Sequence, residues 1–492
     1  MIGTNGALPL PLSGSLPPDL QGTLFRVGPA WPWGVSWSGA AGAWDGGVPG
    51  GVEEAGGGEE AGSGGEDGGS GVAGALHAVE IRDGQAVWYQ RQESEADAGV
   101  FWHAGSVLAL PETGIPSQYS RFLEPEEFAG GLTVPIASHV HRQAADGGRV
   151  LFGVDDGSDE DGARVEDGEG IFLRIGEWDA AGMLRSAQSV ELERSTWQHD
   201  IGITATHVVF IESPTTPLTT SRREAGAVPF GWVPGSEGWV GVVGRGGNGS
   251  AAGGVVADGG VAVRWLRLDP CLVTHVLGAY DEPDGAIVLY VCCYGVPEAG
   301  QSVDLSASVV GPPGLALSGI GGTLGVLERW RIAGEQIERV QLDDRFVEYP
   351  RMDAHCEALE FRYGYSLETA WAALPPTSGV LPGGPQRSDR WTAEAAPFGL
   401  LKFDLARDEI ASWSPGPGCT PSEPLFVRAV DGRSDDEGWL LTIVDDATRG
   451  GSDLYVLDAS SLGRRRPEAI IHLPARLPVR SHGEWVPADR YR

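Results

Sequence analysis

An all-β fold, and within that class a β-propeller, is the architecture that this sequence predicts. From Ala75 onward the chain consists of short apolar runs such as Ala75–Ile81, Ile287–Tyr294 and Gly438–Val444, separated by glycine, proline and aspartate. Such runs are typical of strands joined by turns, and few long segments have helical periodicity. The runs are too numerous for one small barrel and show no clean repeat period, so a propeller with diverged blades fits best.

The predicted elements follow one another in a simple order. The chain from Gly14 to Pro29 is an extended lead-in with one short strand and a Gly-Pro turn. Residues 45–71 consist almost wholly of glycine and small or acidic residues, which predicts a disordered insertion. The runs that we interpret as strands are Ala75–Ile81, Ala86–Gln90, Val100–Leu110, Arg149–Val154, Gly170–Ile175, Val208–Ile211, Trp239–Val243, Val261–Leu268, Ile287–Tyr294, Gly325–Ile332, Phe398–Asp404, Gly438–Val444, Ser452–Leu457 and Glu468–Leu473.

Length and charge restrict the possible functions. We interpret residues 1–492 as a single β-propeller domain, although typical domain sizes alone would suggest about three domains for a chain of this length. Acidic residues outnumber Lys and Arg by 68 to 35, which gives a net charge of −33. Such a field repels nucleic acid and anionic lipid headgroups, so no nucleic-acid partner is expected. The chain has no apolar run long enough to span a bilayer and no basic signal-peptide region, which predicts a cytoplasmic protein.

The stretch Trp197–Phe210 draws attention because it places a histidine among aliphatic residues. Two apolar, β-branched arms flank a small polar break, which predicts a β-hairpin. On a strand alternate residues share a face, so His199 is expected to point the same way as Ile201 and Ile203. A histidine buried there must find a hydrogen-bond partner or bind a ligand.

Four histidines occur in comparable strand-like settings, and they are His139, His199, His275 and His482. Successive members lie 60, 76 and 207 residues apart, so no local finger motif can hold a metal with them. Ligands so dispersed meet only if the fold brings different strands to one point, as the inner strands of a propeller do around its axis. His141 is the alternative to His139 as the first of the four histidines, because residues two apart on a strand can share a face.

Several motifs in order resemble those of the carotenoid cleavage oxygenase family over nearly the whole chain. The N-terminal Leu16-Pro17 to Gly28-Pro29 segment and His199–Thr204 resemble family signatures, as do Thr274–Tyr280, Glu348–Asp353, Ser422–Val427 and Leu473–Gly483. The chain departs from the family pattern at Gly278 and Asp281, where Asn and Glu are usual, and at Arg480-Ser481, where Gly-Phe is usual.

The resemblance implies a seven-bladed β-propeller with loops forming a cap over the metal-bearing axial face. It also implies non-haem Fe(II) on the axis, held by the imidazoles of His139, His199, His275 and His482. Imidazole ligands alone suit Zn, Cu, Fe or Ni, so iron is chosen by the resemblance and not by the residues. Glu112, Glu348 and Glu423 fall at the places of the three family glutamates that orient the rings and offset the charge of the cation.

The implied reaction is cleavage of one C=C bond of a carotenoid or apocarotenoid by O2, which gives two carbonyl products. Family members that act on stilbenoids usually carry Lys immediately before the first glutamate, whereas this chain has Pro111 there and its lone lysine is Lys402. That difference favours an apolar polyene. Phe101, Trp102 and Phe122 are candidates for lining a polyene tunnel, and they are equally good candidates for core residues.

Two other classes of function stay open. The same fold and metal can serve stilbenoid (resveratrol-type) cleavage or the isomerisation found in one branch of the family. A non-catalytic propeller that binds a lipid or protein partner is the third reading, and the retained histidines and glutamates argue against it. An apolar substrate implies possible peripheral membrane contact, which the charge of −33 discourages.

Overall fold

The computed structural model describes most of the chain in fourteen stretches. They are residues 7–29, 74–94, 99–111, 113–126, 136–137, 139–142, 147–155, 170–217, 230–233, 235–246, 261–295, 325–368, 399–477 and 482–491. The insertion predicted at 45–71 lies outside these residues. Within them strands dominate, helical structure is limited to short 3-10 turns, and no helix is long and apolar enough to cross a membrane.

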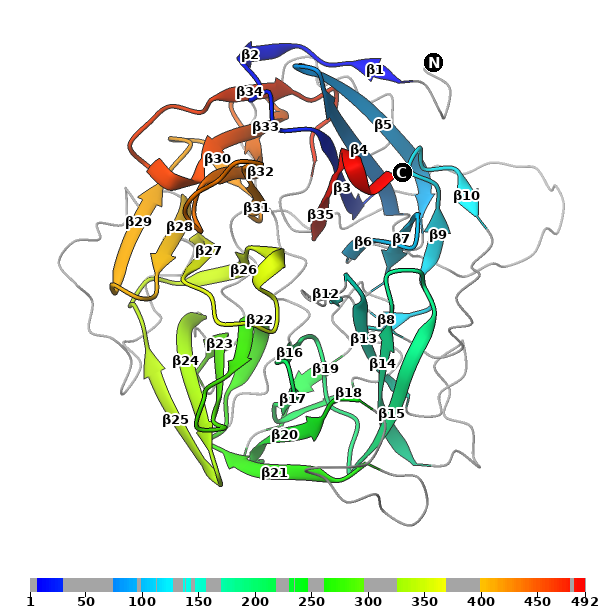
Figure 1. Cartoon of the computed structure of the whole chain (residues 1–492), viewed down its shortest axis with the longest axis vertical. Coiled ribbons are helices and arrows are strands. Elements are labelled where there is room, and N and C mark those ends of the chain that lie inside the picture. Colours follow the sequence, from blue (N-terminus) through cyan, green and yellow to red (C-terminus); the bar gives the residue numbers. More distant parts are fainter. Residues whose placement is uncertain are drawn as a thin grey trace, which may run out of the picture.

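Seven antiparallel sheets stand in a ring around a central axis, each forming one blade (Figure 1). Blade I contains β1 (Leu8–Pro9), β5 (Gln85–Ser94), β4 (Gly74–Arg82), β3 (Gly22–Pro29) and β35 (Gly483–Pro487). Blade II contains β6 (Gly99–His103), β7 (Ser106–Leu110), β9 (Ser117–Tyr119) and β10 (Pro125–Glu126). Blade III contains β12 (His141–Arg142), β13 (Arg149–Asp155), β14 (Ile171–Trp178) and β15 (Leu184–Leu192).

The remaining four blades complete the ring. Blade IV contains β16 (Ile201–Ile203), β17 (His207–Glu212), β20 (Gly238–Gly244) and β21 (Val263–Leu268). Blade V contains β22 (Leu272–Asp281), β23 (Ile287–Tyr294), β24 (Val326–Ala333) and β25 (Gln336–Gln341). Blade VI contains β26 (Val347–Met352), β27 (Tyr363–Glu368), β28 (Gly399–Asp404) and β29 (Glu409–Trp413). Blade VII contains β2 (Leu12–Gly14), β34 (Ala469–His472), β33 (Gly451–Asp458), β32 (Gly438–Asp446), β30 (Cys419–Pro421) and β31 (Leu425–Arg428).

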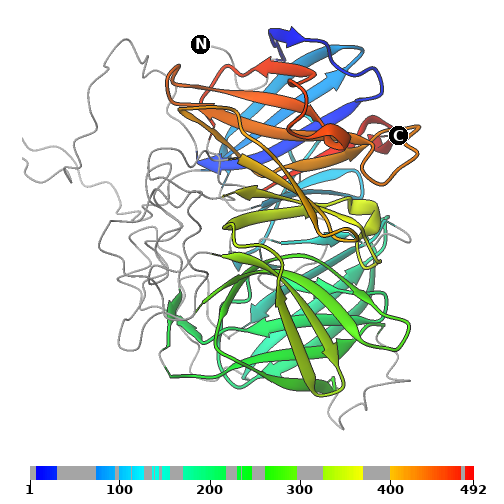
Figure 2. The ribbon, with the colours of Figure 1, turned by 90° about the vertical axis from the view of Figure 1, so that its left-hand side faces the viewer.

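Short elements supplement the blades. Two small two-stranded sheets pair β8 (Thr113–Gly114) with β11 (Ile136–Ala137) and β18 (Thr215–Pro217) with β19 (Phe230–Trp232). Three 3-10 turns are η1 (Ala354–Cys356), η3 (Ala459–Ser461) and η4 (Ala488–Tyr491). Seen edge-on, η1 and the C-terminal end lie on the same side of the ring (Figure 2). The seven-bladed β-propeller predicted from the sequence is therefore confirmed.

The two ends of the chain close the ring. The C-terminal strand β35 pairs with β3 in a register that runs from Gly22 opposite Pro487 to Arg26 opposite Gly483. The N-terminal β2 in turn pairs with β34 at the outer edge of blade VII. Because each terminal segment completes a blade built by the other end, closure places His482 beside residues from the first third of the chain.

Apolar contacts between neighbouring blades form the core. In β23 every residue is buried, and Leu289 packs with Val209 of blade IV and Trp330 of β24. A strand covered by a blade on each face needs apolar side chains on both, which explains the continuous apolar run. Cys292 and Cys293 lie in this strand as small buried residues.

One predicted strand proves to be two. The run Val100–Leu110 forms β6 and β7, which pair as a hairpin. Ala104 and Gly105 make the turn between them with φ of 50° and 92°. Positive φ at both central residues is the geometry of a tight type I′ hairpin turn. The prediction of one strand was wrong because the turn begins with alanine, a residue without the usual turn signal.

Candidate metal centre

The four histidines expected to converge lie together on the propeller axis. His139 lies two residues before β12, His199 two residues before β16 and His482 directly before β35, whereas His275 lies within β22. Each offers one ring nitrogen, and these atoms all lie within 4.8 Å of one another. The inner ends of blades III, IV, V and I thus supply one imidazole each.

Nε2 is the atom that each ring turns toward the common centre. The Nε2 atoms of His139 and His199 are 3.2 Å apart, and those of His199 and His275 are 3.3 Å apart. His275 and His482 are separated by 3.3 Å at the same atoms. Nitrogens bound to one ion at about 2.1 Å and at right angles would lie roughly 3 Å apart, so the spacing fits a shared metal.

Two carboxylates define the tautomers of two rings. Nδ1 of His275 lies 2.5 Å from Glu348 Oε2, and Nδ1 of His482 lies 2.8 Å from Glu423 Oε1. An ionised carboxylate only accepts hydrogen bonds, so each Nδ1 carries the proton. In a neutral ring the Nε2 atom then holds a lone pair, and the 3.3 Å contact between the two Nε2 atoms joins two acceptors. Such a contact is repulsive without a cation, which is why these residues fit a metal ion.

Local irregularities in two inner strands aim these side chains. The pairing of β22 with β23 shifts register between Val273 and Val276, at the position of His275. The pairing of β26 with β27 shifts between Glu348 and Arg351, and Tyr349 in that interval has φ of 52°. A bulge turns a side chain away from the regular alternation of a strand, and strained backbone of this kind concentrates at functional sites.

Two of the four histidines, His139 and His482, are held as neutral rings. Burial, reinforced by the neighbouring His482, His199 and His275, lowers the pKa of His139 well below its ordinary value. Burial also lowers the pKa of His482 to about 4, although Glu423 opposes the shift. Neutral imidazole is the form that binds a metal ion, so the site needs no deprotonation at neutral pH.

The two carboxylates are held as anions despite their burial. Burial alone would raise the pKa of Glu348, but His275 and hydrogen bonds from Tyr294 and Thr274 lower it. For Glu423 burial likewise opposes ionisation, and Arg351 and His482 lower the pKa strongly. Arg351 Nε donates to Glu423 Oε1 at 2.6 Å. Each carboxylate can therefore offset part of the charge of a bound cation.

Aromatic side chains hold the imidazoles from the side. The ring centroid of Trp197 lies 4.8 Å from that of His199. Tyr349 lies 5.2 Å from His275 and 5.1 Å from His482 by the same measure. Packing of this kind restricts ring rotation, and neither residue was singled out from the sequence.

Asp200 ties three blades together beside the cluster, a role that the sequence reasoning missed. Its Oδ1 accepts from the backbone N–H of Ile201 at 2.8 Å, and its Oδ2 accepts from that of Val276 at 2.7 Å. Asp200 Oδ2 lies 3.8 Å from His139 Nδ1, too far for a hydrogen bond. The signal that could have revealed Asp200 is its position directly after His199.

His141, the alternative to His139, lies outside the cluster. Its Nε2 lies 2.9 Å from Asp200 Oδ1 and its Nδ1 lies 3.1 Å from Glu357 Oε1. Burial lowers its pKa, but the hydrogen bonds and charges of these two carboxylates outweigh burial and raise it to about 10. A ring with both nitrogens committed to carboxylates has no lone pair for a metal.

The other residues proposed for the site are placed as follows. Glu112 lies outside the described residues. Phe101 is buried and lines a cavity that reaches His139 and His482, while Trp102 packs edge-on against Tyr491. Phe122 leaves 43% of its surface exposed. The role of all three in a substrate tunnel stays a prediction.

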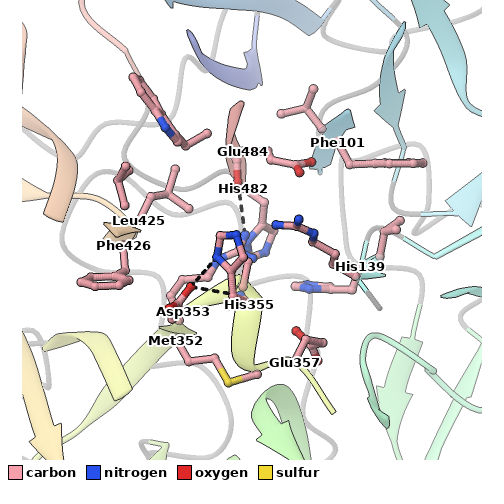
Figure 3. A pocket seen from close by; sticks show the side chains of 18 of the residues that line it. Phe101, His139, Met352, Asp353, His355, Glu357, Leu425, Phe426, His482 and Glu484 are labelled. Carbon is pink, nitrogen blue, oxygen red and sulfur yellow. Dashed lines mark hydrogen bonds and ion pairs between the residues drawn. The ribbon is translucent and has the colours of Figure 1, made fainter. Parts of the chain in front are cut away.

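The cavity lined by Phe101 runs along the axis and has a volume of about 180 Å³. Figure 3 shows His139 and His482 in it, with Glu484 and Phe101 on one side and Asp353, His355 and Glu357 on the other. Apolar side chains from β26 and β31 share the wall with arginines, so this axial cavity is mixed in polarity.

The fold and this cluster define a class of protein, a β-propeller with a candidate four-histidine metal centre on its axis. The sequence model of the family described as Retinal pigment epithelial membrane protein matches residues 59–487. The chain belongs to this family, which is that of the carotenoid cleavage oxygenases, and it is an oxidoreductase of the oxygenase type.

Individual relatives and solved structures are similar over most of the chain. An isoeugenol monooxygenase of Pseudomonas nitroreducens is 26% identical, covering 80% of this chain and 75% of the relative. A carotenoid cleavage oxygenase of Mycobacterium tuberculosis is 25% identical, covering 84% and 86%. Among solved structures, the lignostilbene dioxygenase of Pseudomonas brassicacearum has a TM-score of 0.69 at 20% identity, covering 98% of this chain and 96% of that chain. A cobalt-substituted apocarotenoid oxygenase of Synechocystis has a TM-score of 0.71 at 19% identity with the same coverage.

Proposed function

We propose that the protein is a non-haem Fe(II)-dependent dioxygenase that cleaves one C=C bond of a carotenoid or apocarotenoid with O2, giving two carbonyl products. The observation that carries the proposal is the convergence of four Nε2 atoms, those of His139, His199, His275 and His482. Imidazoles suit several transition metals, and membership of the carotenoid cleavage oxygenase family favours iron.

The four histidines would hold the ion, and bound Fe(II) would supply the activation of O2. Glu348 and Glu423 keep the proton of His275 and His482 on Nδ1 and thereby keep Nε2 available as a ligand. Trp197 and Tyr349 restrict the rings, so that the ligand atoms stay in place while an alkene is positioned beside them.

The preference for a polyene over a phenolic alkene depends on the lysine that this chain lacks near the site. Pro111 stands where stilbenoid-cleaving members usually have Lys, and the chain's one lysine is committed elsewhere. Lys402 is 7% exposed, and its Nζ donates to Asp436 Oδ2 at 2.6 Å and to the carbonyl of Ala459 at 2.8 Å. No lysine is therefore left to meet a phenol oxygen.

A phenolic aryl alkene is the second candidate substrate. It is favoured by relatives named isoeugenol monooxygenase and lignostilbene dioxygenase. The two candidates share the metal and the bond that breaks, and they differ in the length and polarity of the substrate.

The decisive experiment is anaerobic reconstitution with Fe(II), followed by O2 and a panel of apocarotenals, stilbenoids and isoeugenol, with product masses read out. We expect iron bound in an equimolar amount and aldehydes from an apocarotenal.

His199→Ala should lose both the bound iron and the aldehyde products. His207→Ala should keep both, because His207 lies outside the cluster and contacts Asp281. Cleavage of stilbenoids alone would transfer the assignment to the second candidate. Absence of bound metal in the wild type, or unchanged metal content in His199→Ala, would overturn the proposal.

A further inference from the structure

A second cavity next to the axial one gathers arginines in a chain that is otherwise strongly acidic. It has a volume of about 550 Å³ and lies among the β6–β7 turn, β12, the β14–β15 turn, β35 and η4. The arginines that line it are Arg121, Arg142, Arg149 and Arg490. Glu484 is the one acidic residue among the described residues that line it. In a chain with a net charge of −33, such a local excess of positive charge is unexpected.

Glu484 is one carboxylate facing four arginines, and it is held in place by two contacts. Oε1 accepts from Arg149 Nη2 at 2.5 Å, and Oε2 accepts from the backbone N–H of Trp102 at 2.7 Å. Four arginines and one carboxylate leave a net excess of three positive charges among the described residues that line the cavity.

Within the described residues, Arg142 is the member of this group that forms no ion pair and also lines the axial cavity. It lies in β12 and lines both this cavity and the axial cavity. No carboxylate in the described part of the chain forms an ion pair with it, in contrast to Arg149, Arg351 and Arg428. Burial lowers its pKa, the positive charges of Arg490 and Arg149 add to that effect, and the negative charges of Glu484 and Asp353 oppose it.

The neighbouring arginines are held in place around the cavity. Arg121 lies over the ring of Tyr491, 5.2 Å from its centroid. Nη1 of Arg490 lies against Gly147, only 3.4 Å from where a Cβ on that glycine would stand. Tyr491 also packs edge-on against Trp102 at 5.1 Å, which gives the cavity a rigid aromatic wall.

We propose that this cavity binds a small oxyanion of the phosphate or carboxylate class. Guanidinium groups present several N–H donors in a planar fork that matches two oxygens of such an anion. An anion held between Arg142 and Arg490 would relieve the repulsion between them and add to the negative charge that Glu484 supplies. The site lies outside the four-histidine cluster and is independent of the proposed reaction.

The test is calorimetric titration of the full chain with inorganic phosphate and, in a second arm, with succinate, at constant ionic strength. We expect saturable binding of at least one of them to the wild type, and at least tenfold weaker binding to Arg142→Gln. Arg142→Lys should retain part of the affinity, because it keeps the charge without the fork. Arg407→Gln removes an exposed arginine that lines neither described cavity, and should bind like the wild type. The arm that binds identifies phosphate or carboxylate as the preferred chemistry.

Thermal unfolding without phosphate separates this site from a structural role for Arg142. A structural arginine would lower the melting temperature when replaced, whereas Arg142→Gln should leave the melting temperature unchanged or raise it, because it removes repulsion between like charges. Phosphate or succinate should raise the melting temperature of the wild type more than that of the variant. Failure of both anions to bind the wild type, or equal binding to Arg142→Gln, would overturn the proposal.

Discussion

The four-histidine cluster and the arginine-rich cavity both gather basic side chains, yet these side chains respond to burial in opposite ways. Burial, with repulsion from neighbouring cations as a smaller contribution, favours the neutral histidine, and the pKa of His482 falls to about 4. Each neutral ring then presents a lone pair, so the cluster attracts a cation. Arginine keeps its proton in proteins, so Arg142 and Arg490 keep their charge and attract an anion. The acidity of a side chain therefore decides which kind of ligand a crowded site binds.

The largest effect is expected when a histidine of the cluster is replaced by a group that cannot lose its proton. His139→Arg places a fixed charge among the Nε2 atoms, so we expect loss of metal binding and of oxygenase activity. Both losses should exceed the roughly 10- to 100-fold cost of removing a residue that only supports a ligand. Metal analysis and turnover measure them, with His139→Ala to exclude crowding as the cause and His207→Arg as the control. Retained metal in both His139 variants would contradict the assigned ligand.

A buried carboxyl offers a third response, because it can keep its proton. Glu212 in β17 has a buried Oε1 without a hydrogen-bond partner. Burial raises its pKa to about 7, with Glu193 adding to the shift and Arg194 opposing it. Between pH 4.5 and 7 the folded state holds a proton that the unfolded state has lost, so the free energy of unfolding falls as pH rises.

We expect Glu212→Gln to remove that fall, which amounts to about 3 kcal/mol for a shift of this size. Chemical unfolding at pH 5 and pH 8 measures it, and the variant should be the more stable protein at pH 8. Glu409→Gln, an exposed change in β29, is the control. If the free energy of unfolding of the wild type had the same pH dependence as that of Glu212→Gln, the raised pKa of Glu212 would be contradicted.

The carboxylates that support the imidazoles give a smaller test. Glu348→Gln keeps an acceptor for His275 Nδ1 but removes the negative charge, and we expect metal affinity to fall by about 10- to 100-fold. Competition with a chelator measures the change. Glu357→Gln, which loses a carboxylate that contacts His141 and not the cluster, should stay near the wild-type affinity. Equal losses in both variants would point to general electrostatics in place of a specific contact.

The smallest effect is expected at Phe122, beside the arginine-rich cavity. Phe122→Ala removes an exposed ring that Arg121 covers at 4.3 Å from its centroid. That contact contributes about 0.5–1 kcal/mol. The ring also packs against Tyr89 with centroids 5.7 Å apart, and such a pair contributes about 0.5–1.5 kcal/mol. The free energy of unfolding should therefore fall by about 1–2 kcal/mol. Chemical unfolding measures it. A loss of several kcal/mol would show that the side chain is buried in solution.

Much of the site was predictable because chemistry-bearing residues occur in recognisable local settings. His275 lies within a largely apolar strand, and His139, His199 and His482 lie one or two residues before a strand. Glu348 is the second residue of β26, and Glu423 lies two residues before β31. The predicted hairpin at Trp197–Phe210 is confirmed as β16 and β17. His199 lies before β16 and not in it, so the rule that alternate strand residues share a face does not apply to His199 and Ile201. Strand periodicity therefore located the histidine without giving its direction.

Contacts between distant blades were not predictable. Asp200 looks like an ordinary residue after a histidine, and its bonds to Val276 and His141 exist only because three blades meet at the axis. The arginine-rich cavity likewise depends on ring closure, which brings Arg490 at the C-terminus against Gly147 of blade III.

The sequence by itself determined the all-β class, the candidate metal-binding residues and the family, because apolar alternation, turn residues and ordered motifs are local properties. The tertiary structure alone decided which side chains share a neutral, cation-binding environment and which share an excess of charge. Burial, register shifts in β22 and β26, and closure by β35 set those environments. The pKa of a side chain and the ligand that it attracts depend on neighbours that lie hundreds of residues away, as His275 and His482 do.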